Sequence, residues 1–180
     1  MHGLIFREFF AFAEEATSKG FVADMIADGR SARAGDFDSP GPFSHLELIR
    51  MMDFLSRRTG YELSELCHDF GRYLFGQFSG LHPELFADRT TALDFLQGIE
   101  AHIHGQVRTL VPKSHPPLFD VTRPSKTELV MRYRSARSFA DLCGGLIEAS
   151  LEHFGVDGQV SRKLVNDDKT EAVFTITTHG

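Results

Sequence analysis

The sequence predicts an α+β fold in which a helical N-terminal half is followed by an α+β half with a small antiparallel sheet. Through residue 111 the apolar residues follow helical spacing, and from residue 128 onwards stretches with the two-residue alternation of strands appear. Four prolines between residues 112 and 126 separate the two patterns. With 180 residues, the chain has the length of a single domain.

The N-terminal half begins with two short helices. They are expected over residues 4–18 and about 21–28, with Gly20 as the stop between them. Residues 29–42 are rich in Gly, Asp, Ser and Pro and are expected to form a loop.

A third helix is expected from Ser44 to the Gly stop at Gly60. Ser44 and Glu47 have the spacing of a capping box, in which each side chain bonds a free backbone N–H at the start of the helix. Phe43 and Leu48 are placed as the hydrophobic staple that often accompanies such a box.

The next helices lead to the proline-rich stretch. One is expected over about 62–79, and a long one starts at Thr91 and must end near Val111, because Pro112 follows it. Residues 112–126 are expected to be irregular.

The C-terminal part mixes both element types. Residues 128–133 alternate as a strand, residues 138–154 follow an amphipathic helix, and two strands are expected over about 158–165 and 171–178. A turn across 166–169 joins these last two strands.

Composition excludes several classes of function. The net charge of −6 argues against nucleic acid and anionic membranes as general partners. No apolar run approaches the roughly 20 residues of a membrane span, and the N-terminus lacks the features of a signal peptide. Cys67 and Cys143 have no metal-site or disulfide-rich spacing and are expected to be reduced. We therefore expect a cytoplasmic protein. Its 17 Phe residues suit either a roomy apolar cavity or a plain core.

Tyr133, Ser135 and Arg137 form a Tyr-x-Ser-x-Arg run at the end of a predicted strand. In an extended segment this two-residue spacing places the phenol, the hydroxyl and the guanidinium on one face. Three convergent donors, one of them cationic, suit a ligand with a pair of carboxylates.

His102 and His104 both lie on the long helix that ends before Pro112. Two residues apart on an α-helix, their side chains point about 200° away from each other, so the two cannot chelate one ion together. Periodicity does not decide which one faces inward. A core histidine bonded to a carbonyl is the alternative to a metal ligand.

The chain resembles the haem-nitric oxide/oxygen binding (H-NOX) domain family, of the stand-alone bacterial type. Residues that match the family's motifs are Met1, Gly3 and Ile5, Phe70-Gly71-Arg72, Ile103-His104-Gly105-Gln106-Val107, Pro116-Pro117, Tyr133, Ser135 and Arg137, and Gly145-Leu146-Ile147-Glu148. The resemblance implies one domain over residues 1–180, with a helical distal subdomain at 1–60, a haem-ligating α+β subdomain at 61–180 and the haem between them.

What the resemblance implies about the site is specific. His104, and not His102, would be the only protein ligand to the iron of one haem b per chain. Tyr133, Ser135 and Arg137 would hold the haem propionates. Pro117 would press against the porphyrin.

Departures from the family pattern bear on which gas is bound. Members that bind dioxygen carry a distal tyrosine where this chain has Leu142, and a supporting asparagine where it has Leu74. Ile5, Phe9 and Leu146 complete a distal pocket that has no hydrogen-bond donor. The Cys/His zinc cluster that several relatives carry is also missing. So is a tryptophan common in the second helix, and its absence leaves the packing of residues 21–42 open.

The resemblance implies a sensor that binds nitric oxide at ferrous haem, binds carbon monoxide as well, and signals in trans. Expected partners are a histidine kinase or a cyclic-di-GMP enzyme, and the expected oligomeric state is a monomer. A haem carrier or redox buffer is the alternative. An enzyme using His68 with Asp69, or His82 with Glu84, is disfavoured because no nucleophile accompanies either pair.

Overall fold

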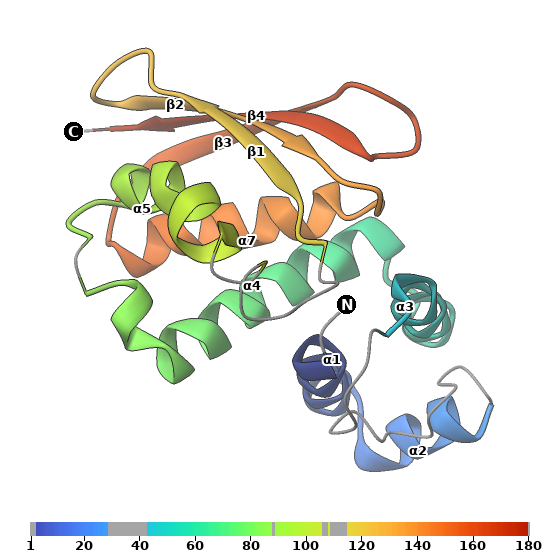
Figure 1. Cartoon of the computed structure of the whole chain (residues 1–180). Helices are drawn as coiled ribbons and strands as arrows, with labels where there is room; N and C mark the ends of the chain where they lie inside the picture. Colours follow the sequence, from blue (N-terminus) through green and yellow to red (C-terminus); the bar gives the residue numbers. More distant parts are fainter. Residues whose placement is uncertain (1–2, 29–42, 88, 106–107, 109–114, 180) are drawn as a thin grey trace.

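The computed structural model describes residues 3–28, 43–87, 89–105, 108 and 115–179. Helices fill the first part of the chain, and a four-stranded antiparallel sheet with one further helix fills the second, which confirms the predicted α+β fold. Figure 1 shows the sheet lying over α7 and α5, with α4 on the other side of α7 and α1, α2 and α3 gathered at one end of α4. Within the described residues, no helix is both long and apolar enough to span a bilayer.

The first helices are α1 (Gly3–Ala16), α2 (Lys19–Ala27) and α3 (His45–Thr59). The capping box predicted at the start of α3 is wrong. Ser44 is the N-cap residue, but its side chain makes no capping hydrogen bond, and the Glu47 side chain is buried. The predicted stop is confirmed, because Gly60 adopts a left-handed φ of 82° and donates its N–H to Ser56 O. The loop predicted over 29–42 lies outside the described residues.

The predicted long helix changes type before it reaches the histidines. After α4 (Leu63–Leu81) and a short 3₁₀ turn (Pro83–Leu85), α5 (Ala92–Gly98) begins where expected, and Thr91 Oγ1 accepts a hydrogen bond from Asp94 N. From Ile99 to His104 the helix is a π-helix. Its predicted end near Val111 lies outside the described residues.

The sheet contains one strand that the sequence did not predict. Its strands are β1 (Leu118–Thr122), β2 (Glu128–Arg134), β3 (Gly158–Leu164) and β4 (Glu171–Thr178), in the order β1-β2-β4-β3. The expectation that residues 112–126 are irregular is wrong for β1. Pro117 and Pro124 flank this strand without entering it, and β1 lies at the sheet edge, where prolines are tolerated.

Two separate hydrophobic cores result. One joins α5, the inner face of the sheet and α7 (Ala140–His153), and the other joins α1, α2, α3 and α4. Leu146 of α7 packs against both. The Phe rings fill these cores in close pairs, such as Phe9 against Phe70 at 5.4 Å and Phe86 against Phe95 at 4.9 Å.

Helices α4 and α7 hold the two cores together and touch through glycine. A Cβ atom on Gly71 of α4 would collide with the backbone carbonyl of Leu142, and one on Gly145 of α7 would collide with that of His68. Neither carbonyl can move without bending its helix.

Gly71→Ala should therefore destabilise the fold, by about 1–3 kcal/mol, because the added methyl group forces the two backbones apart. Gly76→Ala in the same helix is the matched control. Its Cβ would meet no atom within 4 Å, and Ala should raise helix stability by up to about 1 kcal/mol. Thermal unfolding of both variants checks this, and equal melting temperatures would contradict the close crossing.

Candidate functional site

His104 lies at the end of the π-helix and turns inward. Its side chain is 17% exposed, and its ring stacks on Phe119 of β1 at 5.6 Å. His102 is exposed, and its Nδ1 donates to Gly98 O at 3.0 Å on its own helix. The structure thus places one of the two histidines inside and gives the other a local partner.

The His104 ring has two polar neighbours. Nδ1 is buried and lies 3.5 Å from Glu100 Oε2, without an aligned hydrogen bond. The Pro117 backbone is a further hydrogen-bonding neighbour of the ring. Burial lowers the pKa of His104, and the Glu100 carboxylate opposes that shift only in part. The imidazole is therefore kept neutral, which is the form that coordinates metal ions.

The segment with Tyr133, Ser135 and Arg137 is not extended as its spacing suggested. Strand β2 ends at Arg134, and the chain then turns. The Tyr133 hydroxyl donates to Arg137 O at 3.0 Å, and Arg137 N donates to Ser135 Oγ at 3.1 Å. Burial raises the pKa of Tyr133 to about 12, so this phenol stays protonated. The two hydroxyls hold the turn that carries the guanidinium.

Arg137 brings an uncompensated positive charge to this turn. The residue is half-buried, and burial lowers the pKa of its guanidinium. No ion pair joins it to any residue that the structure describes. His45, at the start of α3, lies near enough that the charge of Arg137 adds to burial in lowering the pKa of His45. A partly desolvated cation without a carboxylate suits an anionic ligand.

The remaining predicted site residues are Pro117 and five apolar residues. Pro117 directly precedes β1, and its backbone is a hydrogen-bonding neighbour of the His104 ring. The five apolar residues belong to the helical core: Phe9 and Leu74 are buried in it, and Ile5, Leu142 and Leu146 pack against it while partly exposed. His104 is bridged to Tyr133 by Phe119, whose ring is 5.6 Å from one and 5.8 Å from the other.

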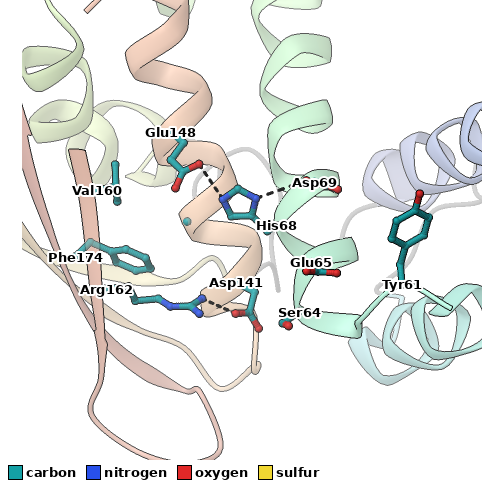
Figure 2. A pocket seen from close by; sticks show the side chains of 11 residues that line it. Tyr61, Ser64, Glu65, His68, Asp69, Asp141, Glu148, Val160, Arg162 and Phe174 are labelled. Carbon is teal, nitrogen blue, oxygen red and sulfur yellow. Dashed lines mark hydrogen bonds and ion pairs between the residues drawn. The ribbon is translucent and has the colours of Figure 1, made fainter. Parts of the chain in front are cut away.

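A cavity of about 580 Å³ lies elsewhere, between α4, α7 and the β3–β4 edge (Figure 2). None of the predicted site residues lines it. Several of its charged groups already pair with one another: Arg162 binds Asp141 at 2.5 Å, and His68 Nε2 lies 3.1 Å from Glu148 Oε2. We therefore place the candidate site at His104 and Arg137, where polar groups lack partners, and not in this cavity.

Sequence reasoning missed three neighbours of the site, namely Glu100, Phe119 and His45. Glu100 could have been found, because it precedes His104 by four residues on one helix. Nothing in the sequence indicates Phe119 and His45 as neighbours of the site, because the fold brings each of them there from a distant part of the chain.

A family model described as Haem-NO-binding (HNOB) matches residues 2–162. The chain therefore belongs to the haem-NO-binding family, whose members are also called H-NOX domains, a class of haem-based gas sensors. This confirms the resemblance seen in the motifs. A search of curated proteins found no match.

Solved structures agree with the family. The chain is similar to the unliganded Fe(II) H-NOX protein from K. algicida, at 27% identity over 100% of this chain and 97% of that one, with a TM-score of 0.92. An H-NOX from Shewanella woodyi, solved in the Fe(II)CO state with IWP-051 bound, is 27% identical over 99% and 95%, with a TM-score of 0.85. The Fe(II)NO form of an H-NOX protein from S. oneidensis shares the fold at 17% identity, with full coverage of both chains and a TM-score of 0.91.

Proposed function

We propose that this protein is a haem-based nitric oxide sensor that signals in trans to a partner protein. The observation that carries the proposal is the inward-facing imidazole of His104, which burial keeps neutral and whose Nδ1 lies beside the Glu100 carboxylate. Such an imidazole suits the single protein ligand to the iron of one haem b per chain.

The residues around His104 fit this cofactor. Haem, when bound, supplies a ferrous iron with an open axial position for a diatomic gas. The Arg137 guanidinium and the Tyr133 and Ser135 hydroxyls would hold the propionates, and Pro117 would support the porphyrin. On the side of the haem where the gas would bind, apolar side chains of the core formed by α1 to α4 would exclude water and offer no hydrogen bond. These side chains are Ile5, Phe9, Leu74, Leu142 and Leu146.

We propose nitric oxide and carbon monoxide as ligands, in line with the Fe(II)NO and Fe(II)CO forms of the two Shewanella relatives. The output would be carried by a histidine kinase or a cyclic-di-GMP enzyme, as the family resemblance implies, with the sensor itself a monomer. Signalling requires that the partner prefers one arrangement of the subdomains 1–60 and 61–180 over another.

An absorption spectrum of the reduced protein, with and without nitric oxide, tests the cofactor and the ligand together. We expect uptake of one equivalent of haem and a shift of the Soret band when nitric oxide is added. A protein that takes up no haem would refute the proposal. Haem uptake with no effect of nitric oxide on any partner would leave a haem carrier as the better description.

Arg137→Ala should weaken haem retention more than Ser135→Ala. A charged contact to a propionate contributes roughly 1.5–3 kcal/mol, whereas a neutral hydroxyl contributes roughly 0.5–1.5 kcal/mol. The rate of haem transfer to an excess of an apo haem protein measures the difference. Equal rates for the two variants would show that the guanidinium does not hold the propionates.

A further inference from the structure

The Glu100 carboxylate lies between His104, Arg108 and the start of β1. Its Oε1 accepts a hydrogen bond from Arg108 Nη2 at 2.6 Å. Its Oε2 accepts the backbone N–H of Phe119 at 3.1 Å and lies 3.5 Å from Nδ1 of His104. Two partners thus hold the carboxylate in place beside the histidine.

The His104 ring has a nitrogen next to this carboxylate that does not yet form a hydrogen bond with it. Within the described part of the chain, Nδ1 of His104 is the one buried side-chain nitrogen or oxygen without a hydrogen-bond partner. A buried donor without a partner costs roughly 1–3 kcal/mol, so a small turn of the ring towards Glu100 would be favoured. Coordination through Nε2 requires the proton to be on Nδ1, which is the atom that faces the carboxylate.

We propose that Glu100 is the positioning residue for the axial histidine, accepting the Nδ1–H of His104 while Nε2 coordinates iron. This inference rests on the proposed haem ligation. A carboxylate acceptor fixes the tautomer and the orientation of the ring and makes the imidazole a more basic ligand. A more basic ligand strengthens the bond between iron and Nε2 and favours ferric over ferrous iron.

The test is Glu100→Gln in the haem-loaded protein, because the amide keeps the size of the side chain and an oxygen for Phe119 N–H but removes the charge. We expect a lower iron–histidine stretching frequency in the resonance Raman spectrum of the ferrous form. We also expect a higher midpoint potential, by roughly 59 mV for each tenfold loss of preference for ferric iron. Asp94→Asn is the matched control: this carboxylate is in the same helix, but it pairs with Arg123 and should leave both values unchanged.

Glu100→Asp provides a second variant if the amide perturbs folding, which circular dichroism would show. Its shorter carboxylate keeps the charge but withdraws from Nδ1, so shifts in the same direction are expected. Native values of both frequency and potential in the folded, haem-loaded variants would overturn the role of Glu100. Failure of the native protein to take up haem would refute the proposed function itself, so the two failures are distinguishable.

Discussion

His104→Gly should lose haem during purification, and imidazole added to the medium should restore haem binding. His104 is the inward-facing histidine, and its side chain is only 17% exposed. Loss of a residue that only hydrogen-bonds to a metal ligand costs about 10- to 100-fold in metal affinity, and removal of the ligand itself should cost at least as much. Glycine leaves a space that free imidazole can fill. Haem content, from the ratio of Soret to protein absorbance, measures the effect.

His102→Ala is the control for this experiment. His102 is exposed and bonds to Gly98 O within its own helix, so its removal should leave haem content unchanged. If His102→Ala lost haem and His104→Gly kept it, the assignment of the ligand would be wrong by two residues. Loss of haem from His104→Gly without rescue by imidazole would indicate a folding defect instead of a missing ligand.

Leu142→Tyr should create dioxygen binding that the native protein lacks. Bound dioxygen carries partial negative charge and gains from a hydrogen-bond donor on the gas side, whereas nitric oxide does not need one. The five apolar residues proposed to line that side supply no donor. A hydrogen bond to such a ligand contributes roughly 1.5–3 kcal/mol, which corresponds to about one to two decades in affinity. Leu142 is only partly buried, so a ring there need not open a well-packed core.

Leu142→Phe is the matched control, because it adds the ring of tyrosine without the hydroxyl. Spectra of the ferrous proteins in air should show dioxygen binding by Leu142→Tyr and none by Leu142→Phe or the native protein. A stable spectrum of a dioxygen complex from the native protein would contradict the proposal that these apolar residues line the gas-binding side of the haem. The same spectrum from Leu142→Phe would mean that ring size, and not the hydroxyl, controls binding.

The order and type of most elements followed from the sequence alone, because local signals encode them. The gain of strand alternation from residue 128 marked β2, and Gly60 ended α3 as its lack of a side chain allows. Motif identities were similarly sufficient to recognise the haem-NO-binding family. Local rules failed where a partner elsewhere in the chain decided the outcome. Strand β1 exists because β2 pairs with it, and no feature of its proline-flanked sequence indicates that pairing.

The arrangement of the candidate site depended on tertiary structure in the same way. Helical periodicity separated His102 from His104 but could not choose between them, and the π-helix that contains both shifts side-chain directions away from the α-helical pattern. The inward turn of His104 is set by Phe119 across from it, and Arg137 is presented by a turn that Tyr133 and Ser135 close. Sequence alone determined which chemical groups are present. The fold decided which of them are buried, paired or left free, because those properties depend on neighbours that are distant along the chain.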